Sequence, residues 1–347
     1  SQQSILLFDI MIRFDEAISI VLSSRCKHDA EQVSIEESVG RILAGDVYSD
    51  MDMPPFNKSA VDGYACRASD LDKPMKVLEV IAAGQVPEYE VLPGTCSKLM
   101  TGGMLPEGAD TVVMVEHTEQ VDNGHIRFLK DKSSSNVCLR GEDIKKGQKV
   151  LERGLKISPR EIAVMASVGY VMPLVYVRPT VAVISTGDEL VEPHQEPSVS
   201  QIRNSNASQL MAQIRETGAI PEYIGIARDT EESTREMLNQ AFEGFDLILL
   251  SGGVSMGDFD YVPKIFEELG VEILFKSIAV QPGRPTVFGM RQEQYIFGLP
   301  GNPVSSFVQF ELLVKPLIYK MMGHVYKARS FSLPMGKAIK RKKSERR

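Results

Sequence analysis

The hydrophobic pattern in the second half of the chain alternates between short apolar runs and longer amphipathic segments. The apolar runs lie at 181–184, 223–227, 247–250, 286–290 and 295–297, and helical periodicity occupies 158–169, 203–218, 229–242 and 303–322. Strands that alternate with helices of about 10 to 15 residues predict a multidomain α/β protein whose main sheet is parallel and doubly wound.

The first half of the chain has a different pattern. Apolar residues recur at helical spacing from Asp9 to about Ser23, which predicts an amphipathic helix. Short β-like runs then occur at Val77–Ile81, Thr111–His117 and Ile126–Leu129, separated by turn residues. The Asp-Asn-Gly turn at 122–124 is a strong hairpin signal, so this region predicts a small β domain.

Composition narrows the class of protein. Hydrophobic residues make up 43% and charged residues 24% of the 347 residues, as in soluble globular proteins. We expect a cytoplasmic protein, since the sequence lacks an apolar run of the roughly 20 residues that a membrane helix needs and lacks signal-peptide features. The four cysteines include no C-x-x-C pair, which argues against a zinc knuckle or a disulfide framework. No membrane partner is expected.

Charge argues against general nucleic-acid affinity, because the formal net charge is −7. The tail 337–347 is an exception, with seven Lys or Arg and one Glu. A nucleic-acid-binding arm is one interpretation. We favour a solvated terminus or a domain that is cut short.

The stretch 247–261 is the strongest candidate for a ligand site. Four apolar residues lead into Ser251-Gly252-Gly253, which predicts a buried strand that ends in a tight turn. Asp258 then caps a predicted helix, so backbone N–H groups would face a phosphate or a similar oxyanion. Because Asp258 and Asp260 would repel a bare anion, we expect a divalent cation to bridge them to it. The alternative is an ordinary strand-to-helix turn with an acidic cap.

Carboxylates recur at the ends of the predicted strands, and these ends would share one edge of the sheet. They are Asp188, Glu189, Asp229, Asp258 and Asp260. Such a group would suit Mg²⁺ with an anionic substrate, although each residue alone could be a helix cap or a solvated charge. The rigid loops 281–285 and 298–305 could wall the pocket, with Arg284 as its cation.

Taken together, the loops resemble the molybdopterin molybdenumtransferase family, which includes bacterial MoeA and the E domain of gephyrin. The motifs are PPFNKSAVDGYA (54–65), TGGMLPEGADTVVMVE (101–116), RGEDI (140–144), STGDEL (185–190), IRNSN (202–206), SGGVSMGDFDYV (251–262), QPGRP (281–285) and GLPGNPVS (298–305). They occur in family order, and eight motifs in order are highly specific.

The resemblance implies four parts. They are a helical linker domain (1–48 with 145–178), a small β domain (49–144), a MogA-like molybdopterin-binding α/β domain (179–326) and the start of a truncated C-terminal β domain (327–347). It also implies a Mg²⁺-dependent reaction that inserts molybdate into adenylylated molybdopterin, releases AMP and gives molybdenum cofactor. The expected assembly is a homodimer whose site lies between the β domain of one subunit and the α/β domain of the other. A molybdopterin adenylyltransferase and molybdoenzyme acceptors are further expected partners.

Motif positions carry the family's functional residues onto this sequence. The expected catalytic residues are Asp62, Thr101, Asp143, Glu189, Asp229 and Asp260, of which Glu189, Asp229 and Asp260 would bind the metal. The expected cofactor-binding residues are Ser251, Gly252, Gly253, Asp258, Arg284, Pro300, Pro303 and Ser305. The backbone N–H groups of 251–253 would bind an oxyanion, and Arg284 with Lys276 would neutralise its charge.

The sequence departs from the family pattern at Ser277 and Gln281, where relatives often have lysine, so this wall is less cationic. Two other functions remain open. A MogA-type molybdopterin adenylyltransferase shares the α/β domain, although the motifs at Asp62, Thr101 and Asp143 argue against it. A scaffold that binds partners without turnover is the second, and the retained acidic loops argue against that one.

Overall fold

The computed structural model describes residues 11–254, 262–328, 330–334 and 336–337. The chain forms two compact units. The α/β unit comprises Ser1–Gly45, Arg153–Arg160 and Met172–Arg347, and the β unit comprises Asp46–Glu152 and Glu161–Val171. The four-part division expected from the sequence stays a prediction.

The α/β unit is built on a six-stranded sheet with the order β16-β13-β17-β20-β19-β18. Its strands are β13 (Thr180–Thr186), β16 (Ile220–Ala227), β17 (Leu247–Ser251), β18 (Glu272–Phe275), β19 (Val287–Arg291) and β20 (Gln294–Leu299). The four strands from β16 to β20 run parallel. Every residue of β17 is buried, as the apolar run predicted for a strand covered on both faces.

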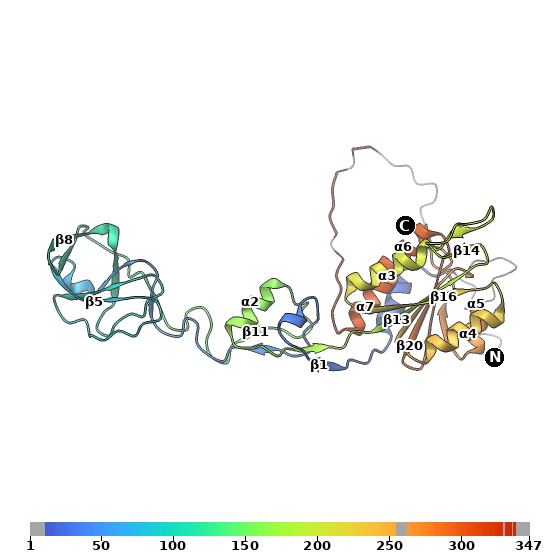
Figure 1. Cartoon of the computed structure of the whole chain (residues 1–347), viewed down its shortest axis with the longest axis horizontal. Helices are drawn as coiled ribbons and strands as arrows, with labels where there is room; N and C mark the ends of the chain where they lie inside the picture. Colours follow the sequence, from blue (N-terminus) through green and yellow to red (C-terminus); the bar gives the residue numbers. More distant parts are fainter. Residues whose placement is uncertain (1–10, 255–261, 329, 335, 338–347) are drawn as a thin grey trace. The chain divides into compact units, whose positions relative to one another are not determined.

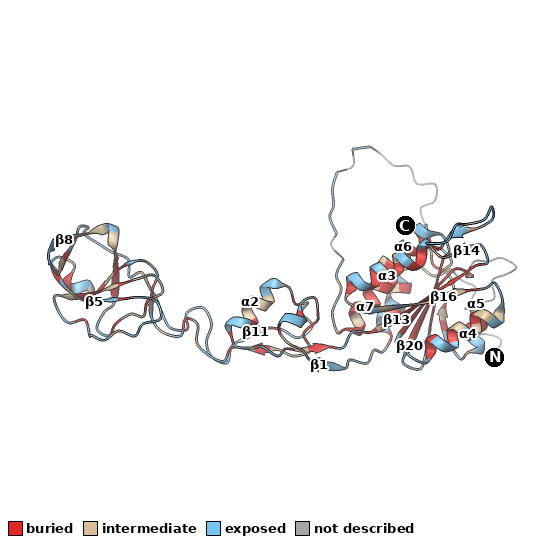
Figure 2. Cartoon of the chain, viewed as in Figure 1, coloured by how far each residue is buried: buried red, intermediate tan, exposed pale blue. Residues whose placement is uncertain are grey.

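Helices cover both faces of this sheet (Figure 1). They are α1 (Phe14–Ser23), α3 (Ser205–Thr217), α4 (Glu231–Phe242), α5 (Val262–Glu268), α6 (Pro303–Gln309) and α7 (Lys315–Met321). One hydrophobic core joins Val183 and Leu249 of the sheet to α1, α3 and α7. The second core joins Ile184 and Leu250 to α4 and α5. Figure 2 shows the sheet as the buried layer between them. The doubly wound α/β class is thereby confirmed.

The edge of the sheet differs from the purely parallel prediction. β18 pairs antiparallel with β19, and β19 pairs antiparallel with β20. The chain turns between β19 and β20 through Gln292 and Glu293 only, and Gln292 has a φ of 56°. So short a connection can join antiparallel strands but not parallel ones.

The predicted helix 303–322 contains a π-helical turn at Phe310–Val314, between α6 and α7. There the N–H of Lys315 donates to the carbonyl of Phe310. Pro316 follows, and its ring would clash with the carbonyl of Leu312 in a regular α-helix. The wider turn provides the space that this proline needs.

The remaining short strands of the α/β unit form two ribbons. β1 (Ala30–Gln32) pairs antiparallel with β12 (Leu174–Tyr176), and β14 (Leu190–Val191) pairs parallel with β15 (Ile202–Arg203). The second ribbon matters for the site, because it brings the segment after β13 alongside the segment that enters α3.

The β unit contains a six-stranded sheet with the order β7-β4-β6-β5-β9-β8. Its strands are β4 (Gly63–Cys66), β5 (Met75–Ile81), β6 (Thr95–Leu99), β7 (Thr111–Met114), β8 (Thr118–Asp122) and β9 (His125–Phe128). The hairpin predicted at 122–124 joins β8 to β9. Smaller elements are β2 (Val47–Tyr48) with β11 (Lys149–Leu151), β3 (Lys58–Ser59) with β10 (Val137–Cys138), and α2 (Pro159–Ser167), whose first two residues belong to the α/β unit.

Candidate active site

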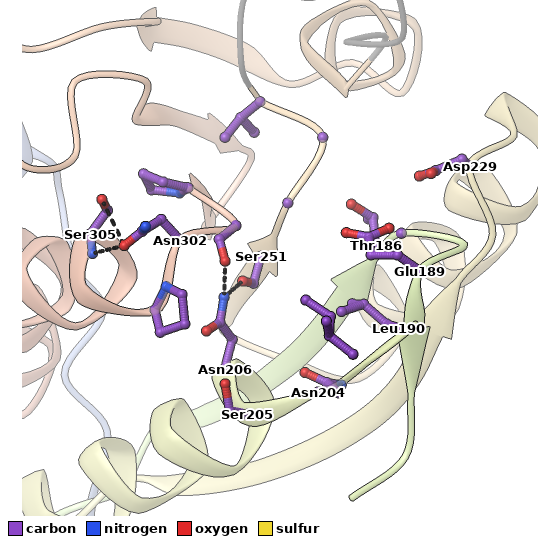
Figure 3. A pocket seen from close by; sticks show the side chains of 18 of the residues that line it. Thr186, Glu189, Leu190, Asn204, Ser205, Asn206, Asp229, Ser251, Asn302 and Ser305 are labelled. Carbon is purple, nitrogen blue, oxygen red and sulfur yellow. Dashed lines mark hydrogen bonds between the residues drawn. The ribbon is translucent and has the colours of Figure 1, made fainter. Parts of the chain in front are cut away.

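A pocket of about 520 Å³ lies at the carboxyl edge of the parallel strands in the α/β unit. Its lining residues are Thr186, Gly187, Glu189, Leu190, Ile202, Arg203, Asn204, Ser205, Asn206, Asp229, Ser251, Gly252, Gly253, Val254, Pro285, Pro300, Gly301, Asn302, Pro303 and Ser305. Eight of the residues predicted from the motifs are among them. Figure 3 shows two ends, one with the carboxylates of Glu189 and Asp229, the other with the amides and hydroxyls of Asn206, Ser251 and Asn302.

The carboxylate end follows β13 and β16. The main chain turns at Gly187 (φ 140°), where a Cβ would lie 2.4 Å from Oε2 of Glu189, so a side chain here would displace this carboxylate. Oδ2 of Asp229 accepts the backbone N–H of Asp188 at 3.1 Å. The described residues contain no group of three His, Cys, Asp or Glu that could hold a metal ion. Two carboxylates in one pocket still fit Mg²⁺, which takes most of its ligands from water and substrate.

Asn204 fixes the entry to α3. Its Oδ1 accepts the N–H of Ala207 at 3.2 Å and the hydroxyl of Ser185 at 3.1 Å. Its Nδ2 donates to the hydroxyl of Tyr223 at 3.0 Å, and this hydroxyl donates to Glu192 at 2.8 Å. Burial, together with the Glu192 carboxylate, raises the pKa of Tyr223, so this tyrosine remains protonated and able to donate. The first turn of α3 is therefore anchored at the pocket.

The glycine turn after β17 differs in one respect from the expectation. The N–H of Gly252 donates to the carbonyl of Leu299 at 3.0 Å, so it is not available to an oxyanion. The N–H of Gly253 has no hydrogen-bond partner among the described residues. A Cβ at Gly252 would lie 2.6 Å from Oγ1 of Thr186, which shows how closely the turn packs on the end of β13.

The opposite wall is the loop before α6. Asn302 caps this helix, because its Oδ1 accepts the N–H groups of Val304 at 3.1 Å and Ser305 at 3.3 Å. Pro300 and Pro303 flank the cap and line the pocket, as the motif GLPGNPVS implied. Their fixed φ angles make this wall rigid.

The expected cation does not line the pocket. Arg284 is exposed and its neighbour Pro285 lines the pocket instead. The loop that carries Arg284 is fixed from behind, since Gln309 donates from Nε2 to the carbonyl of Pro282 at 3.1 Å. Lys276 forms an ion pair with Glu267 at 2.9 Å and is also absent from the lining. Neither Arg284 nor Lys276 therefore lines the described pocket.

The other predicted site residues that the structure describes belong to the β unit. Oδ1 of Asp62 accepts both the backbone N–H of Thr101, at 2.6 Å, and its hydroxyl, at 2.7 Å. The Thr101 hydroxyl and then its N–H hold the pKa of Asp62 below its ordinary value. The carboxylate of Asp62 therefore stays ionised over the whole neutral range.

Asp143 lies on a loop that is tied to the segment before β3. The N–H of Asp143 donates to the carbonyl of Met53 at 3.1 Å. Arg140 donates from Nε to Oδ2 of Asp52 at 2.7 Å, and its backbone N–H donates to Oδ1 of Asn57 at 2.8 Å. These bonds hold the motif RGEDI against the motif that begins at Pro54. Asp258 and Asp260 lie outside the described residues.

The sequence reasoning gave no role to several polar residues that line the pocket, among them Thr186, Asn206 and Asn302. The sequence does contain a signal for these three residues. Each lies at the end of a predicted strand or at the start of a predicted helix, where small polar side chains cap or bind. The motif IRNSN contributes to the family resemblance and opens a predicted helix, but neither observation assigns a role to Asn206.

Comparison with known proteins identifies the family of this chain. A family model described as MoeA N-terminal region (domain I and II) matches residues 12–169, and one described as probable molybdopterin binding domain matches residues 182–320. A molybdopterin molybdenumtransferase of Bacillus subtilis (strain 168) is 37% identical over 318 residues, which are 88% of this chain and 74% of the relative. The chain belongs to the molybdopterin molybdenumtransferase family.

Other members of the molybdopterin molybdenumtransferase family show the same relationship. One from Staphylococcus epidermidis is 37% identical over 319 residues, which are 90% of this chain and 76% of the relative. A molybdopterin biosynthesis MoeA protein from Pyrococcus horikosii has a similar structure, with a TM-score of 0.79 and 35% identity, covering 91% of this chain and 81% of that chain. The resemblance stated from the motifs is confirmed. No helix among the described residues is both long enough and apolar enough to span a membrane.

Proposed function

We propose that this chain is a molybdopterin molybdenumtransferase that inserts molybdate into adenylylated molybdopterin, cleaves the phosphoanhydride with Mg²⁺, and releases AMP to give molybdenum cofactor. Family membership supports the reaction class. The observation that carries the proposal is a pocket of about 520 Å³ with two carboxylates at one end and hydroxyl and amide groups at the other. Pockets of roughly 300–1,000 Å³ hold small-molecule substrates.

Glu189 and Asp229 are the described residues that would hold Mg²⁺. When bound, the ion would neutralise phosphate oxygens and polarise the phosphoanhydride. The chain's own groups would bind and orient the substrate, with the Gly253 N–H and the Ser251 side chain as donors. Phosphoryl chemistry of this kind needs positioning and charge neutralisation and requires no protein nucleophile.

Motif positions alone support further roles. Asp62, Thr101 and Asp143 would act as catalytic residues, Asp260 as a third metal ligand, and Asp258 as a cofactor-binding residue. Since the hydroxyl of Thr101 donates to Asp62, it would act as an anchor for that carboxylate and not as a nucleophile.

The direct test is AMP release from adenylylated molybdopterin by the purified protein with Mg²⁺, with and without molybdate. We expect release that depends on molybdate and is lost in Asp229→Ala and Asp260→Ala. A MogA-type adenylyltransferase would instead release pyrophosphate from ATP and molybdopterin. Tight binding of the substrate without any release would support a scaffold and contradict the proposal.

We also propose a cytoplasmic homodimer that receives its substrate from a molybdopterin adenylyltransferase and passes its product to molybdoenzyme acceptors. The family resemblance is the support for these points. Light scattering on the purified protein measures the mass directly, and twice the chain mass of 38.4 kDa is expected. A monomeric mass at assay concentration, together with full activity, would contradict the dimer.

A further inference from the structure

Asn206 joins three elements at the amide end of the pocket. It lies in the first turn of α3, and its Nδ2 donates to Oγ of Ser251, the last residue of β17, at 2.8 Å. The same nitrogen donates to the carbonyl of Gly301, in the loop before α6, also at 2.8 Å. Figure 3 shows the amide pointing at Ser251 from below. Asn206 is only 8% exposed, so these bonds are shielded from bulk water.

The partners of Asn206 determine which way its amide faces. The carbonyl of Gly301 can only accept a hydrogen bond, so the NH₂ group must point toward it. Both hydrogens of Nδ2 are then used, one on Gly301 and one on Ser251. Oγ of Ser251 is consequently an acceptor in this bond, and its own hydrogen is free to be donated elsewhere.

The hydroxyl hydrogen of Ser251 has no acceptor among the described residues. Asn206 is the only described partner of this oxygen, and Ser251 is 3% exposed while lining the pocket. The neighbouring N–H of Gly252 is bonded to Leu299. The donors that the end of β17 offers to the pocket are therefore the Ser251 hydroxyl and the N–H of Gly253.

A second observation concerns two buried polar atoms of the pocket. Oδ1 of Asn206 and Oγ1 of Thr186 are both buried and have no hydrogen-bond partner among the described residues, and both residues line the pocket. Leaving a buried polar atom unpaired costs stability, and such atoms in native proteins need an explanation. Oδ1 of Asn206 stays unpaired, while both N–H groups of the same side chain donate to Ser251 and Gly301. These two bonds fix the direction of the amide, as a positioning role requires.

We propose that Asn206 is a positioning residue, which fixes the hydroxyl of Ser251, the substrate donor named above, so that its hydrogen is donated to an oxyanion of the bound substrate. The ligand group is a phosphate oxygen, from the nucleotide or from the pterin. Ser251 touches the substrate and Asn206 acts through Ser251. The identity of the substrate rests on the proposed function, whereas the oxyanion site does not.

Equilibrium binding of inorganic pyrophosphate with Mg²⁺, measured by calorimetry, tests the site without any catalytic step. We expect Ser251→Ala to weaken binding roughly tenfold, since a hydrogen bond to a charged group is lost. Ser251→Thr keeps the hydroxyl and should stay within about threefold of the parent protein. Asn206→Ala should weaken binding to a similar extent. Ser208→Ala, on an exposed position of α3, is the matched control and should change nothing.

The double variant Asn206→Ala with Ser251→Ala separates positioning from a structural role. If Asn206 acts through Ser251, the double variant binds no more weakly than Ser251→Ala alone. Additive losses would overturn the positioning role, and unchanged binding in Ser251→Ala would overturn the donor role even if Asn206→Ala fails to fold. Absence of pyrophosphate binding by the parent protein would overturn the oxyanion site itself.

Two further titrations identify the source of the phosphate. If Ser251→Ala weakens AMP and leaves molybdopterin unchanged, the group belongs to the nucleotide, and the reverse result assigns it to the pterin. Weakening of neither ligand would overturn the inference for the substrate. A protein that binds pyrophosphate through Ser251 but shows no molybdate-dependent AMP release would disprove the proposed function and leave the oxyanion site standing.

Discussion

Thr101 gives both of its hydrogen-bond donors to one oxygen of Asp62. The backbone N–H and the hydroxyl lie 2.6 and 2.7 Å from Oδ1, and together they lower the pKa of the carboxyl. The pair joins the residue that precedes β4 to the residue that follows β6 by two positions. Two loops from different motifs therefore share one rigid contact.

Thr101→Ala should raise the pKa of Asp62 toward its ordinary value, because the hydroxyl is the largest cause of its depression. Thr101→Ser retains a hydroxyl and should preserve most of the shift. A carboxyl with a depressed pKa stabilises the fold at neutral pH and loses this contribution as pH falls through its folded pKa. The stability difference between Thr101→Ala and the parent should therefore shrink below about pH 4. Carboxyl titration by NMR and unfolding at pH 7 and pH 2 measure both effects, and an equal difference at both pH values would contradict the assignment.

Glu189→Gln and Asp229→Asn should each raise the Mg²⁺ concentration needed for half-maximal activity roughly tenfold, which corresponds to about 1.4 kcal/mol of lost ion binding. Each substitution keeps the side-chain shape and removes one negative charge. Glu232→Gln, an exposed residue in the first turn of α4, is the control for charge alone. Equal Mg²⁺ dependence in all four proteins would remove these two residues from the metal site.

Gly63→Ala should destabilise the β unit by about 1–3 kcal/mol. A Cβ at this position would lie 2.0 Å from the carbonyl oxygen of Val113 on the adjacent strand β7, so the sheet must open to admit it. Gly244→Ala is the control, since a Cβ there meets nothing within 4 Å. Denaturant unfolding measures the change, and equal midpoints for the two variants would show that β4 and β7 can separate at little cost.

Cys66 and Cys96 should resist thiol reagents in the folded protein. Both are fully buried, and burial raises the pKa of each thiol to about 12, so almost no thiolate exists at pH 8. Cys26 and Cys138 are partly exposed and should react first. Mass spectrometry after timed alkylation counts the modified sites. Modification of Cys66 or Cys96 as fast as Cys138 would mean that the β unit opens readily.

The parts of the fold that sequence reasoning predicted correctly have strong local causes. The run 247–250 is apolar throughout because both faces of β17 are covered. The Asn-Gly pair at 123–124 suits the tight turn that joins β8 to β9. Pro159 begins α2 as predicted from the proline after Ser158, which fits the first helical turn.

The parts that sequence reasoning missed depend on contacts between distant residues. The antiparallel edge follows from the two-residue connection at 292–293, which was too short to stand out between two apolar runs. The charge of Arg284 and its place in a rigid loop predict a cation in the pocket, but neither property determines the direction of its side chain. The bonds of Asn206 reach Ser251 and Gly301, which are 45 and 95 positions away. Such pairings cannot be predicted from the spacing of residues along the chain.

The loop that carries Arg284 packs against Gln309 of α6. Gly283 has a φ of 108°, and a Cβ there would lie 2.2 Å from Nε2 of Gln309, the nitrogen that holds the carbonyl of Pro282. A side chain at position 283 would therefore displace Gln309, and at this φ it would also strain the backbone. The bond from Gln309 to Pro282 would be lost, and this wall of the pocket would lose its anchor.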